Sequence, residues 1–259
     1  RLSSIFMKDL VFIIYDAFGD WISANGMIRH LSNRYQKVYL IHDTPVVVPF
    51  TQNMFKDNVN IIPVQGMNIP HSDYDVIDLR IHEIYSSPGG SGVYFNKMNK
   101  FGTDSFGSTD NASSFYCELG LNPEMRVKEF YYERDLEKED ELFQSLNLPS
   151  KYSVVCEMHD GMIDKKYVKE GHVVNLHRLT DNFMHTIKVI ENANDIHLIE
   201  NSISLFIYHM QHISQMKPVD ICLHTYARQE PHRRCTSPDS DNVYLNMLKC
   251  PKLLNWSFV

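Results

Sequence analysis

The fold is decided by the stretch "VFIIYDAFGDWISANGMIRHLSNRY", residues Val11–Tyr35. Its first residues form a continuous run of β-branched and aromatic side chains, which is typical of a parallel strand covered on both faces. Apolar side chains then recur at helical spacing, at Ile22, Met27, Ile28 and Leu31. Between the two segments lies a turn that contains Asp16, Gly19 and Asp20. The stretch therefore predicts a buried strand that passes through a tight, acidic turn into a helix.

Similar strand and helix signals alternate along most of the chain. In the first half, strands are predicted at Leu10–Asp16, Lys37–His42, Val59–Val64 and Tyr74–Ile81. In the second half, they are predicted at Tyr152–His159, His172–Leu179, Asp195–Glu200 and Asp220–Ala227. Helices are predicted at 49–57, 113–120, 134–148, 182–193, 202–213 and the beginning of 245–259. This alternation favours an α/β fold with right-handed crossovers, in which two Rossmann-like α/β units, residues 1–148 and 149–259, face each other across a cleft.

Two segments depart from the alternation. The segment Ser86–Ser114 is rich in Gly, Ser and Asn, and it is too long for a simple connection, so we expect a functional loop there. The predicted helix at 134–148 carries a run of acidic residues, which we interpret as a face exposed to solvent.

Composition excludes several classes of protein. The chain has 259 residues and a net charge of −7, so no basic field covers it and nucleic acid is not an expected partner. The five cysteines are odd in number and form no CxxC pair, which favours reduced thiols over disulfides or a zinc site. The thirteen histidines form no HExxH motif, so we expect no metal. Because no apolar run has transmembrane length and the first residues do not resemble a secretion signal, we expect a cytoplasmic protein without a transmembrane segment.

The acidic turn in the first half has two interpretations. Gly19 permits a tight turn with a close approach of the backbone. Asp20, at the start of the helix, is either a helix cap, worth on the order of 1 kcal/mol, or a general base aimed into the cleft, and the two roles are compatible. Asp16 is expected to support the turn. "DAFGDW" is not a GxGxxG fingerprint, which disfavours a dinucleotide-binding dehydrogenase.

The second half offers a helix start next to an acid. Glu200 ends a predicted strand, and Asn201, Ser202 and Ser204 begin the helix that follows. Backbone N–H groups at a helix start form an anion site suited to a diphosphate, while Glu200 can accept hydrogen bonds from ribose hydroxyls. The alternative is an ordinary capped helix.

Basic residues and a further histidine add to the second half. His177 and Arg178 end another predicted strand, and Arg178 is suited to phosphate oxygens, although a surface salt bridge is an equally good interpretation. Arg228 belongs to the basic segment "HTYARQEPHRRC", which fits an anionic substrate or a partner surface. His159 is expected at a strand end, where it binds a donor substrate, supports the base or forms part of a turn.

Four segments, taken in order, resemble the GT-B glycosyltransferases related to the heptosyltransferases. They are "FGDWISANGMIRHLSNRY", "SSFYCELGLNPEMR", "NLHRLTDNFMHTIKVIENANDIHLIENSISLF" and "HTYAR…NW". In that family the Asp of a "GD" turn is the proposed base, and Asp20 occupies this position. The sequence lacks the proline usual in heptosyltransferases, and 259 residues is short for this fold, so heptose is not implied. A small, divergent chain of this kind would suit a viral or bacterial surface-glycan enzyme.

The resemblance implies a metal-independent, inverting glycosyltransferase. Residues 1–148 would bind a glycan or glycoprotein acceptor near Asp16, Gly19 and Trp21, with Asp20 as the base. Residues 149–259 would bind a nucleotide-diphosphate sugar, with no other cofactor. The expected donor-binding residues are His159, His177, Arg178, Glu200, Asn201, Ser202, Ser204 and Arg228. A non-catalytic nucleotide- or glycan-binding scaffold and a sugar-nucleotide epimerase remain as alternatives.

Overall fold

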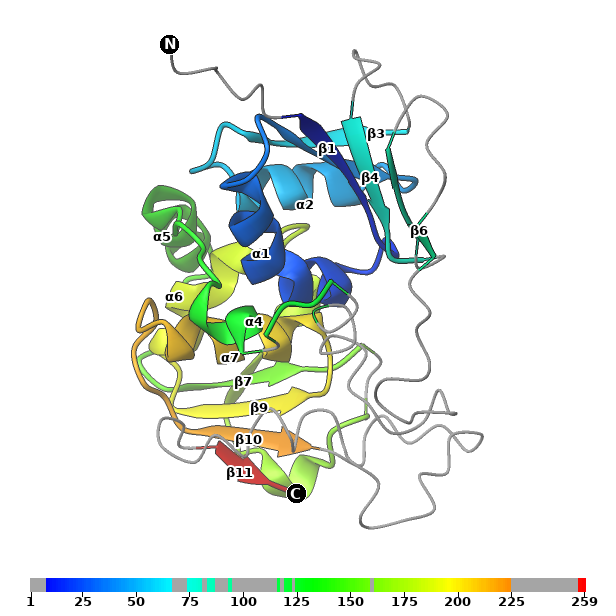
Figure 1. Ribbon diagram of the computed structural model, residues 1–259. Coiled ribbons are helices and arrows are strands. Elements are labelled where there is room, and N and C mark those ends of the chain that lie inside the picture. The colour runs from blue at the N-terminus through cyan, green and yellow to red at the C-terminus, as the bar shows by residue number, and fades with distance from the viewer. Residues whose placement is uncertain are drawn as a thin grey trace. The chain divides into compact units, whose positions relative to one another are not determined.

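A computed structural model of the chain describes residues 8–66, 74–80, 83–86, 93–94, 116, 119–122, 124–158, 161–224 and 256–259. The chain divides into two compact units, unit 1 at Arg1–Glu133 and unit 2 at Arg134–Val259. In Figure 1 unit 1 runs from blue to green and unit 2 from green to red. Among the described residues, no helix has the length and apolar character needed to cross a bilayer.

Unit 1 contains a six-stranded sheet with the order β3-β2-β1-β4-β5-β6. Its elements are β1 (Asp9–Ile13), α1 (Phe18–Ser32), β2 (Val38–His42), α2 (Val47–Met54), β3 (Ile61–Gln65), β4 (Tyr74–Asp78), β5 (Glu83–Ser86), β6 (Val93–Tyr94) and α4 (Met125–Lys128). The first four strands are parallel, whereas β5 and β6 pair antiparallel. The predicted loop at Ser86–Ser114 is therefore wrong at its beginning, where the chain forms the end of β5 and then β6.

Unit 2 contains a five-stranded parallel sheet with the order β11-β10-β9-β7-β8 (Figure 1). Its strands and α-helices are α5 (Leu136–Ser145), β7 (Tyr152–Cys156), β8 (His172–Asn175), α6 (Ile187–Glu191), β9 (Asp195–Ile199), α7 (Ser202–His212), β10 (Ile221–His224) and β11 (Trp256–Phe258). The described residues of this unit also form three 3₁₀ turns, η1 (Lys165–Tyr167), η2 (Leu176–Arg178) and η3 (Phe183–Thr186). The prediction of two α/β units is confirmed, with a parallel sheet in unit 2 and four parallel strands in the mixed sheet of unit 1.

Several predicted elements differ in the structure. The strand expected at His172–Leu179 stops at Asn175, because the Asn175 side chain accepts the His177 N–H and starts the η2 turn. The terminal segment was expected to begin as a helix. That beginning lies outside the described residues, and its end forms β11 beside β10.

Helix α1 is fixed in unit 1 by close backbone contacts. The Tyr116 hydroxyl donates to the Ser23 carbonyl oxygen at 2.9 Å and accepts the Met27 N–H at 3.0 Å, so it lies within the helical hydrogen-bond ladder. At Gly26, an added Cβ would lie 2.3 Å from the Met125 carbonyl oxygen of α4. Glycine is therefore required for the approach of α4 to α1.

The acidic helix α5 belongs to unit 2, since it packs against η3 and α6. The boundary between the units thus falls after Glu133, upstream of the division expected between residues 148 and 149. The expectation that all its acidic residues face solvent is wrong at one position. Glu139 is fully buried and accepts a hydrogen bond from Arg134 Nε at 2.9 Å, and Arg134 Nη1 also donates to Glu191 at 2.9 Å.

We expect Glu139→Gln to destabilise unit 2 by about 1–3 kcal/mol, because it leaves a partly buried guanidinium with fewer charged acceptors. Glu141→Gln is the matched control on the same helix, since Glu141 forms an exposed ion pair with Lys138. That change should cost less than about 1 kcal/mol. Urea unfolding of both variants measures the difference, and equal losses of stability would contradict the structural role of Glu139.

Candidate functional site

Both sheets have a switch point, where the connections on either side of one strand run in opposite directions. In unit 1 the chain proceeds from β1 through β2 to β3 on one side and then places β4 on the other side of β1. In unit 2 it proceeds from β7 to β8 and then places β9 on the other side of β7. Open α/β sheets bind ligands at the carboxyl ends of the strands beside such a point. The two candidate sites are therefore the carboxyl ends of β1 and β4 and those of β7 and β9.

At the unit 1 switch point, Asp16 joins the segment after β1 to α1 and to the segment after β2. Its Oδ1 accepts from Trp21 Nε1 at 3.3 Å and lies 3.0 Å from His42 Nδ1, while Oδ2 accepts the Thr44 N–H at 2.6 Å. The Thr51 hydroxyl of α2 lies 2.8 Å from the other ring nitrogen of His42. Asp16 thus holds the turn, and its contacts extend to two helices.

The pKa values of this network follow from its contacts. Burial alone would raise the pKa of Asp16, but hydrogen bonds from His42 and Thr44 outweigh it and hold the pKa below the ordinary value. Burial lowers the pKa of His42 in spite of the neighbouring carboxylate. The pair therefore consists of an ionised carboxylate and a neutral imidazole that donates from Nδ1.

Asp20 lies in the first turn of α1 and is not its N-cap. The N-cap is Ala17, and it makes no side-chain hydrogen bond to the helix. Within the described part of the chain the Asp20 carboxylate makes no hydrogen bond or ion pair, and burial raises its pKa to about 6. A half-buried carboxylate of this kind suits proton transfer near neutral pH better than it suits a structural cap.

Sequence reasoning missed a charged cluster beside this site. After β4, the Asp78 carboxylate accepts from the backbone N–H and the guanidinium of Arg80, and Arg80 Nη1 donates to Asp43 at 2.7 Å. The Tyr15 hydroxyl donates to the Arg80 carbonyl oxygen, so the cluster borders the segment after β1. The signal in the sequence was the acid and arginine at the end of the predicted strand "YDVIDLRI". This local signal does not predict the strand order that places Asp78 and Arg80 next to β1.

At the unit 2 switch point, Asn201 links β7 and α7. Its Nδ2 donates to Cys156 Sγ at 3.1 Å, and its Oδ1 accepts the N–H groups of Ile203 and Ser204. The Ser204 hydroxyl in turn accepts the Asn201 N–H. The prediction that the N–H groups from Asn201 to Ser204 await a diphosphate is therefore wrong for three of these residues, because a capping box already occupies them.

Of the other predicted donor-binding residues, Glu200, Ser202, His177 and Arg178 are described, and they follow strands of the same sheet. Glu200 follows β9 directly, and Ser202 is the first residue of α7. His177 and Arg178 are exposed in the η2 turn after β8. Beside them, Glu157 follows β7 and accepts the Ile163 N–H at 3.0 Å.

Three parts of the sequence-based site lie outside the described residues. They are His159, Arg228 and most of the segment Ser86–Ser114. Their predicted roles stay predictions.

Comparison with known proteins gives a distant structural similarity. No protein-family model matches the chain, and no curated protein matches it. Among solved structures, the chain is similar to the glycosyl transferase family 9 protein from Veillonella parvula DSM 2008, with 10% identity and a TM-score of 0.43. The similarity covers 85% of this chain and 80% of that one.

We expect Asp20→Asn to stabilise the protein at pH 8. The pKa of Asp20 is about 6 in the folded chain and about 4 when unfolded, so the folded state retains the proton that the unfolded state loses. Wild-type stability should fall relative to the variant as pH rises from about 4 to about 6 and then stay constant. The gain at pH 8 should be on the order of 1–2 kcal/mol after allowance for solvent screening, and it should vanish near pH 4.

Thermal unfolding from pH 4 to pH 8 measures this difference. Asp181→Asn, which replaces an exposed aspartate of unit 2, is the control and should show no such trend. Lower stability of the Asp20→Asn variant at pH 8 would instead identify Asp20 as a stabilising first-turn residue.

Proposed function

We propose that the protein is a glycosyltransferase that moves a sugar from a nucleoside-diphosphate sugar to a glycan hydroxyl without a metal ion. The observation that carries the proposal is the Asp20 carboxylate at the unit 1 switch point. It is half-buried, its pKa is raised to about 6, and it has no hydrogen-bond or ion-pair partner within the described residues. Such a group is costly for stability, and its position at a ligand-binding edge supports a role in chemistry.

In the proposed reaction, Asp20 accepts the proton of the acceptor hydroxyl as its oxygen attacks the anomeric carbon. The bond from that carbon to the diphosphate oxygen breaks, and the nucleoside diphosphate leaves with the electron pair. A direct displacement of this kind inverts the anomeric configuration. Asp16 keeps the turn in place, and Gly19 and Trp21 lie in the same turn and helix start on the acceptor side.

We place the donor at the unit 2 switch point. Glu200 is positioned after β9 to accept hydrogen bonds from the ribose hydroxyls. The Ser202 N–H and the positive end of the α7 dipole favour the diphosphate, and Arg178 at the neighbouring strand end supplies a charge. In this arrangement Asn201 and Ser204 hold the helix start and do not contact the donor. Fixed donors of this kind stabilise the charge of the leaving group.

One observation favours a second candidate, a nucleotide- or glycan-binding scaffold without activity. The capping box of α7 satisfies donors that a diphosphate would otherwise use. A scaffold would bind nucleotide or glycan, and it would have no transfer for Asp20 to support.

Calorimetric titration with UDP, GDP, ADP and CMP, in EDTA and again with Mg²⁺, tests the donor site. We expect one nucleoside diphosphate to bind equally well under both conditions. Glu200→Gln should weaken that binding about tenfold, which corresponds to roughly one hydrogen bond to a charged group. Glu170→Gln is the matched control at the exposed amino end of β8 and should bind as the wild type does. Binding by none of the nucleotides would contradict the donor site.

Transfer is tested with the sugar nucleotide that binds and a panel of glycan acceptors. We expect Asp20→Asn to bind the donor with unchanged affinity and to lose about 10²- to 10⁴-fold in transfer rate, as is typical when a general base is removed. Unchanged transfer by this variant would exclude Asp20 as the base. Absence of transfer by the wild type, with intact nucleotide binding, would favour the scaffold.

A further inference from the structure

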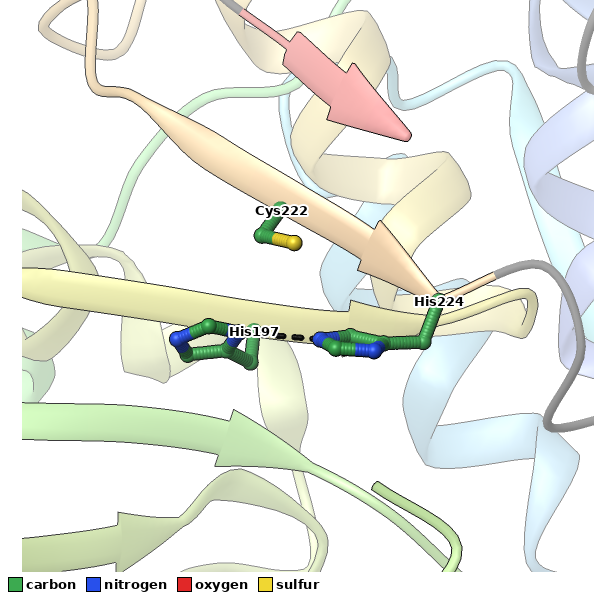
Figure 2. Close-up of side chains that lie close together, drawn as sticks. All are labelled: His197, Cys222 and His224. Atoms are coloured by element: carbon green, nitrogen blue, oxygen red, sulfur yellow. Dashed lines mark hydrogen bonds between the residues drawn. The ribbon is translucent and has the colours of Figure 1, made fainter. Parts of the chain in front are cut away.

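A polar chain of side chains crosses one face of the unit 2 sheet. Register pairs Cys222 of β10 with His197 of β9, and His224 lies two residues further along β10, so all three side chains share a face. One ligand atom from each lies within 4.8 Å of the other two. Figure 2 shows the two imidazole rings end to end with the Cys222 sulfur beside them.

The hydrogen bonds around the cluster orient its ligand atoms. His197 Nε2 lies 3.0 Å from Asp195 Oδ2, and this bond leaves the Nδ1 lone pair directed at His224 Nε2, 2.9 Å away. Asp195 is itself held by the Lys169 N–H at 3.1 Å. A carboxylate that fixes the tautomer of a histidine is the usual outer partner of a metal-bound imidazole.

Both histidines of the cluster are buried. His197 is 3% exposed and His224 is fully buried, and the Tyr167 ring lies against His224 at 5.4 Å. Neutral imidazoles are the form that binds metal ions. Ser257 of β11 pairs with Cys222 and lies on the same face, and its hydroxyl donates to the Ile221 carbonyl oxygen at 3.4 Å.

We propose that His197 Nδ1, His224 Nε2 and Cys222 Sγ bind a Zn²⁺ ion. Zinc–nitrogen and zinc–sulfur bonds of about 2.0–2.1 and 2.3 Å in a tetrahedron place the ligand atoms roughly 3.4–3.6 Å apart. This separation lies between the 2.9 Å of the two nitrogens and the 4.8 Å limit of the set, so small side-chain rotations suffice. A water molecule completes the tetrahedron.

The proton balance of binding is simple. The hydrogen bond between the two imidazoles breaks, and His224 carries its proton on Nδ1. Cys222 loses its thiol proton to solvent, so one proton is released for each Zn²⁺ bound. The ion would join β9 to β10, and it is independent of the proposed transfer chemistry at the carboxyl edge.

The test uses the full chain after removal of metal with a chelator, and Co²⁺ as the spectroscopic probe. We expect one Co²⁺ per chain, a thiolate-to-cobalt charge-transfer band, and displacement of Co²⁺ by Zn²⁺. Cys222→Ser should abolish the band. Cys156→Ser is the matched control, because Cys156 lies on the opposite face of the same sheet, and it should keep the band.

Asp195→Asn tests the positioning role of the carboxylate and should weaken Co²⁺ binding about 10- to 100-fold while the band remains. A measurement on the wild type alone covers the case in which a variant fails to fold. In this measurement, peptide mass spectrometry detects the alkylation of each cysteine. Zn²⁺ should slow the alkylation of Cys222 and leave that of Cys156 unchanged. A band that survives Cys222→Ser, or the absence of both the band and the protection, would overturn the proposal.

Discussion

The structure of unit 1 depends on the ionised carboxylate of Asp16. This one side chain accepts hydrogen bonds from α1, from His42 at the end of β2 and from the backbone after β2. The segment after β1 has no regular structure of its own, so its course is set by these bonds and by the buried strand before it. Because Trp21 is both a donor to Asp16 and part of the core, the start of α1 cannot shift without loss of packing.

The consequence of this fixed turn is the position of Asp20. The groups around the turn donate hydrogen bonds to Asp16, whereas Asp20 has no partner in the described residues. The two carboxylates, four residues apart, therefore have pKa values shifted in opposite directions. Such a separation of roles between nearby acids is typical of sites in which one acid is structural and the other takes up a proton. Half-burial of the ionised Asp20 carboxylate lowers the stability of the folded chain, and a role in function is a reason for such a residue to be retained.

At the unit 2 switch point, neutral groups fix the start of the helix. Asn201 bridges the end of β7 and the start of α7, and the capping box satisfies the helix donors internally. This arrangement makes the helix start rigid and reduces the number of N–H groups available to an anion. In the donor site that we propose, recognition is therefore assigned to Glu200, Ser202 and Arg178 and not to the helix start as a whole. The polar chain from Asp195 to His224 lies on a sheet face and is a separate feature of the same unit.

The sequence by itself determined most strands, several helices and the two α/β units, because long apolar runs and helical periodicity are local signals. The short strands β5, β6 and β11 were not predicted. It also singled out Asp16, Asp20 and Glu200, since each follows a clear strand pattern. Strand order, the cluster of Asp43, Asp78 and Arg80, and the meeting of His197 with Cys222 and His224 were decided only by the tertiary structure. These groups are far apart in the chain, and only the pairing of strands brings them together. Burial, which sets the pKa of Asp20 and hides Glu139, likewise depends on neighbours that no local pattern reveals.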